Sequence, residues 1–171
     1  EVPLEFSPGS SWNYSVSTDV LGYLIELISG KSFDTFLKER IFKPLNMNDS
    51  GFYVPERNLN RFAANYIFNE GKESGESISL INQDTKESGP PILIEDPMIS
   101  PYSKNPTFFS GGGGLVSTID DYLNFCIMLL NKGSYKNHQI LSEKTINLMT
   151  NNHITDKKDL LETASGRWSE T

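Results

Sequence analysis

The sequence predicts an α-rich α+β fold with a few short antiparallel strands. Apolar residues recur at helical spacing over residues 17–30 and 118–133, and again over 33–42 and 141–149. Between about residues 46 and 107 this period fades, and short segments rich in β-branched and aromatic residues alternate with polar, Gly and Pro clusters. Helices on both sides of a few short strands indicate an α+β protein in which helices dominate.

The length and net charge of the chain limit the number of domains and the kinds of partner to expect. Its 171 residues suffice for one ordinary domain, which buries roughly 70% of its unfolded surface. The net charge of -7 argues against nucleic acid or an anionic membrane as a partner. No apolar run approaches the ~20 residues of a membrane span. We expect residues 1–171 to form a single section, with residues 150–171 as a weakly patterned tail.

The first helix is expected to begin at Ser17 or Thr18 and to end at Gly30. Either hydroxyl can cap the helix, and Asp19 would place a negative charge at the positive end of its dipole. Leu21, Leu24, Ile25 and Ile28 form its predicted apolar side.

Tyr14 lies a few residues before this expected helix. The preceding segment, Phe6-Ser7-Pro8-Gly9-Ser10-Ser11, is typical of a turn. Because a turn precedes Tyr14 and a helix follows it, we expect the backbone at Tyr14 to be rigid. The Tyr14 phenol is expected to point away from the helix body.

A second helix is expected from Phe33 to Phe42, with Ser32 as its N-cap and Pro44 ending it. Its apolar side consists of Phe33, Phe36, Leu37 and Ile41. The short link between the two helices predicts an αα-hairpin. Gly30-Lys31-Ser32 is not a phosphate-binding loop, because Ile25 stands where that loop needs a glycine.

The middle of the chain predicts short strands and loops. The expected strands are Phe52–Val54, Ala64–Phe68, Ser77–Ile81 and Ile92–Glu95. Three prolines between residues 97 and 106 predict an extended, irregular segment, which is either a wall of a binding site or a simple connection.

Four consecutive glycines, Gly111 to Gly114, precede a third helix. Thr118 is its expected N-cap, followed by a stripe of Ile119, Tyr122, Leu123, Cys126, Leu129 and Leu130 that ends at Asn131-Lys132-Gly133. On this stripe Cys126 is expected to be a small core residue. The loop lacks the spacing of a dinucleotide or Walker loop. It is either structural or a border of the substrate cleft.

A last helix is expected after Ser142, which would cap it. Leu141, Ile146 and Met149 form its apolar side.

Several blocks together resemble one enzyme family. They are Pro8-Gly9-Ser10, Tyr14-Ser15-Val16, Leu21-Gly22, Ser29-Gly30, Pro44-Leu45-Asn46-Met47, the glycine block through Ser117-Thr118 to Asp121, and Leu141-Ser142 through Met149. The set is similar to serine β-lactamases and penicillin-binding-protein-like hydrolases, including class C β-lactamases, esterases and DD-peptidases. The resemblance covers about residues 6–149, the middle section of that family. It implies the helical region of the β-lactamase/transpeptidase-like fold.

The resemblance assigns a catalytic role to Tyr14. In the family a Tyr-x-Asn motif follows a Pro-Gly turn, and its tyrosine helps to move protons for a nucleophilic serine. Val16 stands here in place of the asparagine. Esterase-type relatives often lack that asparagine, so Val16 slightly favours esters over β-lactams.

The other two catalytic motifs of the family are absent from these 171 residues. No serine is followed three residues later by lysine, and neither Lys-Thr-Gly nor His-x-Gly occurs. We therefore expect a central fragment of a hydrolase that forms an acyl-serine with a small-molecule ester, amide or β-lactam, the fragment itself being inactive. The alternative is a non-catalytic interaction module or an inactive relative.

Cofactors and metals are not expected. His138 and His153 are far apart in sequence, lack neighbouring ligands at metal-binding spacing and are predicted to lie on the surface. The compartment stays open. A section without its covering sheet would expose apolar surface, which predicts self-association of the fragment.

Overall fold

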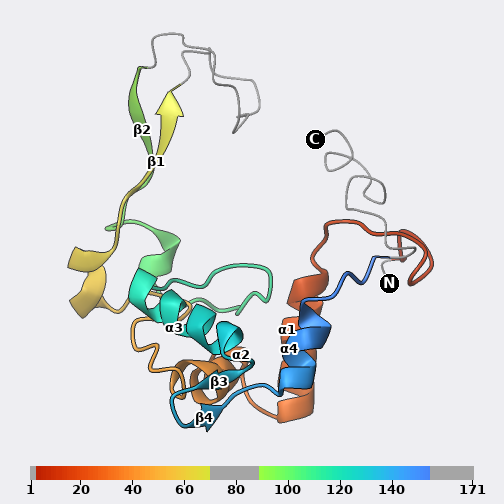
Figure 1. Ribbon diagram of the computed structural model, residues 1–171. Helices are drawn as coiled ribbons and strands as arrows, with labels where there is room; N and C mark the ends of the chain where they lie inside the picture. The colour runs from red at the N-terminus through yellow and green to blue at the C-terminus, as the bar shows by residue number, and fades with distance from the viewer. Residues whose placement is uncertain (1–2, 70–88, 155–171) are drawn as a thin grey trace. The chain divides into compact units, whose positions relative to one another are not determined.

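The computed structural model describes residues 3–69 and 89–154 (Figure 1). These residues belong to two compact units. One unit joins Glu1–Ser50 to Phe109–Thr171, and the other is Gly51–Phe108. The predicted α-rich α+β fold with short antiparallel strands is confirmed. The expected strand Ser77–Ile81 and residues 155–171 of the expected tail lie outside the described residues.

The first unit holds most of the helices. Its elements are α1 (Ser17–Ser29), α2 (Phe33–Leu37), the π-helix η1 (Lys38–Phe42), α3 (Ile119–Leu130), β3 (Ser134–Tyr135), β4 (His138–Gln139) and α4 (Glu143–Met149). The second unit has the 3₁₀-helices η2 (Glu56–Arg61) and η3 (Pro101–Ser103) and the strands β1 (Asn65–Asn69) and β2 (Gly89–Glu95).

Helix α1 ends where the sequence predicts and begins differently. Gly30 adopts φ 67° and donates its N–H to the Glu26 carbonyl, the left-handed stop that glycine favours. The N-cap is Val16, whose side chain makes no capping hydrogen bond, so the expected cap at Ser17 or Thr18 is wrong. Instead, the Ser17 N–H donates to the Ser15 Oγ at 3.2 Å.

The second helix is split. A regular turn over α2 passes into η1, where the Lys43 N–H reaches back five residues to the Lys38 carbonyl at 2.9 Å. Pro44 has no N–H to donate to the carbonyl four residues earlier, so a regular α-helical ladder cannot continue through this point. The single helix Phe33–Phe42 expected from periodicity is thus an α-turn followed by a π-turn.

A carboxyl of α1 joins the first two helices. The Phe33 N–H donates to Glu26 Oε1 at 2.7 Å. Ser32 is the N-cap residue, but its hydroxyl donates to Thr35 Oγ1 and caps no backbone group. The two helices pack together as the predicted αα-hairpin.

The core of the first unit lies between η1, the following turn and α3. Its buried members are Phe42, Leu45, Met47, Met128 and Tyr135. Leu45 and Met128 are fully inaccessible to solvent. The Tyr135 hydroxyl donates to Asn124 Oδ1 at 2.9 Å, so its polar end is paired inside this apolar cluster.

The core-facing side of α3 differs from the predicted stripe. Asp121 and Met128 are buried, whereas Ile119, Tyr122, Leu123 and Leu130 are exposed. Cys126 is also exposed, so its expected place in the core is wrong. Leu129 of the predicted stripe does pack against the core, but the fully buried Met128 lies outside that stripe. Periodicity alone does not distinguish which face of the helix meets the core.

Most of the predicted apolar side of α1 is likewise exposed to solvent, although Ile25 is half-buried. Leu21, Leu24 and Ile28 are exposed, and only Gly22 is buried. The expected self-association through such faces stays a prediction.

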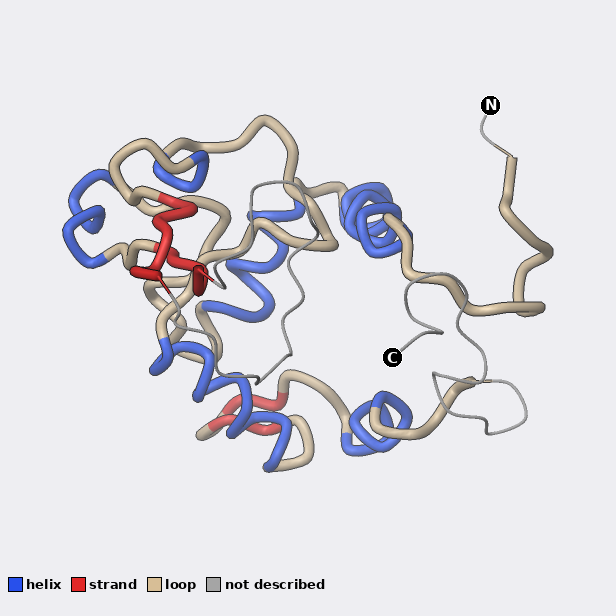
Figure 2. Tube along the Cα trace, turned by 90° about the horizontal axis from the view of Figure 1, so that it is seen from above, coloured by secondary structure: helices blue, strands red, loops and turns tan. Residues whose placement is uncertain are grey.

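A small hairpin that the sequence pattern does not predict follows α3. Strands β3 and β4 pair antiparallel, and β3 packs against α3 (Figure 2). Gly133 enters the hairpin at φ 92°, and a Cβ on it would lie 2.0 Å from the Leu141 carbonyl oxygen. The sequence pattern predicts a helix stop at Gly133 but not this turn into a hairpin.

The caps of α3 and α4 agree with the sequence. Thr118 Oγ1 accepts the Asp121 N–H at 3.2 Å, and Ser142 Oγ accepts the Thr145 N–H at 3.0 Å. In α4 the predicted apolar Ile146 is buried, whereas Met149 is exposed.

In the second unit β1 and β2 form a two-stranded antiparallel ribbon (Figure 1). Tyr66 faces Leu93 in its register. The predicted strand Phe52–Val54 is wrong: Val54 donates one backbone hydrogen bond to the Tyr102 carbonyl, and Pro55 then prevents a ladder from continuing. The proline-rich segment is less irregular than expected, because η3 forms within it with Ser100 as its N-cap.

Asp121 fastens α3 to the loop that follows the core turn. Its Oδ2 accepts the Asp49 N–H and the Ser50 hydroxyl, each at 2.8 Å. The side chain is buried, so these bonds have little competition from water.

We expect Asp121→Ala to destabilise the protein by about 2–3 kcal/mol, because two hydrogen bonds lose their buried acceptor. Asp120→Ala is the matched control: Asp120 lies in the same helical turn but is exposed, and its loss should cost at most about 1 kcal/mol through the helix dipole. Urea unfolding of both variants makes the comparison. Equal destabilisation by the two variants would contradict this role of Asp121.

Candidate active site

Tyr14 lies shortly before α1, as the sequence predicts, on a segment without regular secondary structure. Its side chain is 66% exposed. The residues after it are tied to the helix: Ser15 and Ser17 share a hydroxyl–hydroxyl bond, and the Val16 carbonyl accepts the Asp19 N–H at 3.0 Å. The site of Tyr14 is therefore connected to the first turn of α1.

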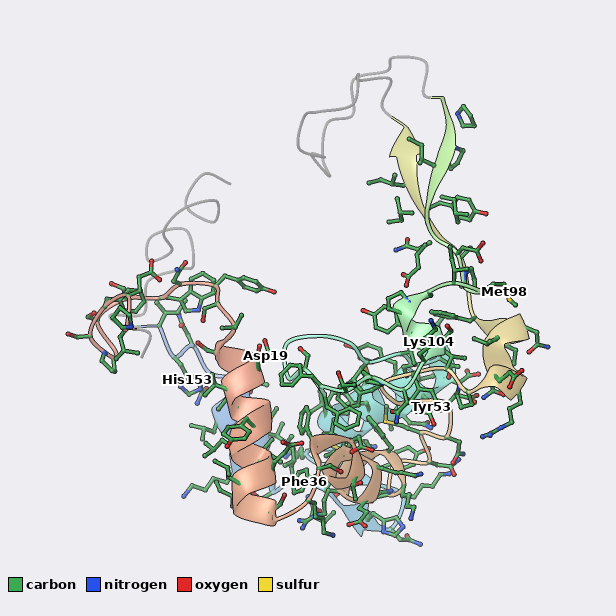
Figure 3. The ribbon with its side chains drawn as sticks, turned by 180° about the vertical axis from the view of Figure 1, so that it is seen from behind. Asp19, Phe36, Tyr53, Met98, Lys104 and His153 are labelled. Atoms are coloured by element: carbon green, nitrogen blue, oxygen red, sulfur yellow. The ribbon has the colours of Figure 1, made fainter. Side chains whose placement is uncertain are left out.

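Asp19 is in that first turn (Figure 3). Its Oδ1 accepts the Ser110 hydroxyl at 2.5 Å and the Gly112 N–H at 3.3 Å. Ser110 Oγ in turn accepts the N–H groups of Gly112 and Gly113, at 3.1 and 3.0 Å. The carboxyl thus holds the glycine loop through both a side chain and a backbone amide.

These bonds change the acidity of Asp19. The Ser110 hydroxyl, with smaller contributions from the Gly112 and Gly111 amides, lowers the pKa of the Asp19 carboxyl, and partial burial opposes this. A lowered pKa in the folded state means that the folded structure stabilises the ionised carboxylate of Asp19 more than its protonated form. The resulting stabilisation is present above the unfolded pKa of the carboxyl and is lost as the pH falls through its folded value.

The glycine loop approaches the helix backbone closely. A Cβ on Gly111 would lie 2.0 Å from the Thr18 carbonyl oxygen, and one on Gly22 would lie 3.4 Å from the Gly111 Cα. Only glycine at position 111 permits this approach. By contrast, a Cβ on Gly113 would have no heavy atom within 4 Å.

A hollow of about 290 Å³ lies along the loop. Its walls are Phe33 and the segment from Ser110 to Leu115. Most of the wall is backbone, and Phe33 and Leu115 supply apolar side chains. The loop is therefore a packing element against α1, and it also borders a hollow. That this hollow belongs to the substrate cleft stays a prediction.

The sequence pattern does not predict the Asp19–Ser110 pair. Locally, Asp19 is only a charge favoured by the helix dipole, and no motif gives Ser110 a role. The two residues are 91 positions apart, and no local pattern connects them. The available signal was a serine directly before a run of glycines that has a helix start to pack against.

Within residues 3–69 and 89–154, no group of three or more His, Cys, Asp and Glu side chains is arranged to hold a metal ion. His138 and His153 are both exposed, as predicted. The His153 Nε2 lies 2.6 Å from the Leu148 carbonyl oxygen at the end of α4. Across the described parts of the chain, no helix has the length and apolar character needed to cross a membrane.

The beta-lactamase family model matches residues 1–159. The chain therefore belongs to the beta-lactamase family, as the resemblance implied. Esterases and D-alanyl-D-alanine carboxypeptidases are among the relatives, in agreement with a hydrolase family.

Two relatives align over most of the chain. Protein Rv1367c from Mycobacterium tuberculosis is 34% identical over 157 residues, which cover 92% of this chain and 34% of the relative. The N-acetylmuramyl-L-alanine amidase of Bacillus subtilis is 26% identical over 159 residues, covering 91% and 34%. The chain thus spans about a third of the length of these curated relatives.

The fold is also that of solved relatives. Simvastatin synthase (LovD) from Aspergillus terreus superposes with a TM-score of 0.64 at 22% identity. The match covers 88% of this chain and 32% of that protein. It supports the helical region of the β-lactamase/transpeptidase-like fold.

Proposed function

We propose that this chain is the central section of a serine hydrolase that forms an acyl-serine intermediate with an ester, amide or β-lactam and passes the acyl group to water. In this proposal Tyr14 moves a proton for the nucleophilic serine. The nucleophile lies outside these 171 residues, because no Ser-x-x-Lys occurs within them.

The position of Tyr14 carries the proposal. Tyr14 is 66% exposed and lies on a segment tied to the start of α1. The glycine loop with its adjoining hollow is fastened to the same helical turn through Asp19. A proton-moving group and a hollow joined to one rigid turn suit acyl transfer, which needs positioned groups around the reacting atoms.

A covalent probe tests the acyl-serine mechanism. We expect a fluorophosphonate to label one serine of the full-length protein that carries this chain, and the labelled residue to lie outside the 171 residues in a Ser-x-x-Lys turn. Peptide mapping by mass spectrometry locates the label, and pre-incubation with an ester substrate should reduce it.

The same experiment decides the alternative of a non-catalytic module or inactive relative. A folded full-length protein that takes up no fluorophosphonate or penicillin label and hydrolyses no ester would overturn the proposal. Parallel assays with p-nitrophenyl butyrate, a p-nitroanilide amide and a chromogenic β-lactam separate the three substrate classes. The Val16 substitution leads us to expect the highest turnover with the ester.

A further inference from the structure

We propose that Asp19 and Ser110 are a positioning pair for the reaction that Tyr14 serves. By fastening the glycine loop to the first turn of α1, the pair fixes the loop-lined hollow relative to the Tyr14 segment. The inference rests on the proposed function of Tyr14 and adds two residues that act through others.

The segment that carries Tyr14 is hydrogen-bonded to the first turn of α1. Ser15 and Val16 follow Tyr14 directly, and both are bonded to the first turn of α1. The Val16 carbonyl accepts the N–H of Asp19 itself at 3.0 Å. A shift of this turn therefore moves the backbone that carries Tyr14.

The first turn of α1 is in turn hydrogen-bonded to the glycine loop. Asp19 Oδ1 receives the Ser110 hydroxyl and the Gly112 N–H, and Ser110 Oγ receives the Gly112 and Gly113 N–H groups. The loop has four glycines and little side-chain packing of its own, so these bonds restrict a segment with large conformational freedom. The close approach of Gly111 to the Thr18 carbonyl needs the same alignment.

The glycine loop determines the shape of the hollow. Residues from Ser110 to Leu115 form most of the hollow of about 290 Å³, so the shape of the hollow follows the backbone of the loop. Loss of the Asp19–Ser110 bond weakens the restraint that the hollow and the Tyr14 segment share, leaving the longer bond from the Gly112 N–H to Asp19. Since a displacement of 1 Å at a reacting group can reduce a rate by about 100-fold, the pair matters for turnover without touching substrate.

Fluorine NMR of the full-length protein with 3-fluorotyrosine at position 14 reads out this positioning directly. We expect Ser110→Ala and Asp19→Ala each to shift or broaden the Tyr14 fluorine signal. Ser110→Thr retains the hydroxyl and should keep the wild-type signal. Asp120→Ala is the matched control, because it removes a carboxyl from the first turn of another helix, and it should also leave the signal unchanged.

Kinetics measure the consequence for the reaction. Ser110→Ala and Asp19→Ala should each lower kcat for p-nitrophenyl butyrate by about 10- to 100-fold, with less change in KM. The double variant should be no slower than the slower single variant, since both changes break one unit. Ser110→Thr should recover most of kcat.

The outcomes separate this inference from the proposed function. An active, label-accepting wild type whose Ser110→Ala variant keeps its kcat and its fluorine signal overturns the positioning pair alone. A folded wild type without label or turnover overturns both. If Ser110→Ala fails to fold by circular dichroism, Ser110→Thr decides: wild-type kcat supports the pair, and a loss equal to that of Asp19→Ala overturns it.

Discussion

Gly111→Ala is expected to destabilise the protein by at least about 3 kcal/mol, because the added methyl group has no room. Its Cβ would lie 2.0 Å from the Thr18 carbonyl oxygen and 2.9 Å from the Thr18 carbonyl carbon. Both are backbone atoms of α1, so the clash cannot be relieved by turning a side chain. The loop and the helix must separate, which also breaks the bonds that Asp19 makes to Ser110 and Gly112.

Gly113→Ala is the matched control for this change. A Cβ on Gly113 would meet nothing within 4 Å, and Gly113 is not among the glycines with positive φ. We expect a change of no more than about 0.5 kcal/mol in the free energy of unfolding. Chemical unfolding of the two variants, followed by circular dichroism, measures both. A Gly111→Ala protein as stable as Gly113→Ala would contradict the close packing of the loop on α1.

Tyr14→Phe in the full-length protein is expected to lower kcat for ester hydrolysis by about 100- to 10,000-fold, the usual contribution of a positioned proton-transfer group. The change removes one oxygen and keeps the ring, and the side chain is largely exposed. The free energy of unfolding should therefore change by no more than about 0.5 kcal/mol. Steady-state kinetics and thermal unfolding of the same preparation test the two statements together.

Tyr23→Phe controls for loss of a phenol elsewhere in the same region. Tyr23 is 57% exposed on α1, and its variant should keep wild-type turnover. Near-normal ester turnover by Tyr14→Phe would refute the catalytic role of Tyr14. A loss of turnover accompanied by an equal loss of folded protein would also count against it.

Local signals in the sequence account for most helix ends. Thr118 and Ser142 cap α3 and α4 as predicted, and Gly30 ends α1 in the left-handed conformation. Such features depend on a few neighbouring residues, so a sequence pattern contains them. The exception is the start of α1, where Val16 takes the cap position and the nearby hydroxyls bond to one another.

The faces of the helices were less predictable. Apolar spacing on α3 indicated a stripe through Cys126, whereas the core receives Met128 from another face. The π-turn before Pro44 also departs from regular helical periodicity. Pro44 lacks an N–H, which interrupts the helical hydrogen-bond ladder locally, and the spacing of apolar residues does not reveal this change.

The sequence by itself determined the α-rich fold class, the family and the placement of Tyr14 one step before a helix. Each of these is written in contiguous residues, where capping, periodicity and turn chemistry act over a few positions. Only the tertiary structure decided that Asp19 holds Ser110 across 91 positions and that Asp121 holds Ser50 across 71. Hydrogen bonds between distant residues need the backbone paths of both partners, and the close passage of Gly111 past Thr18 exists only once the loop and the helix have met.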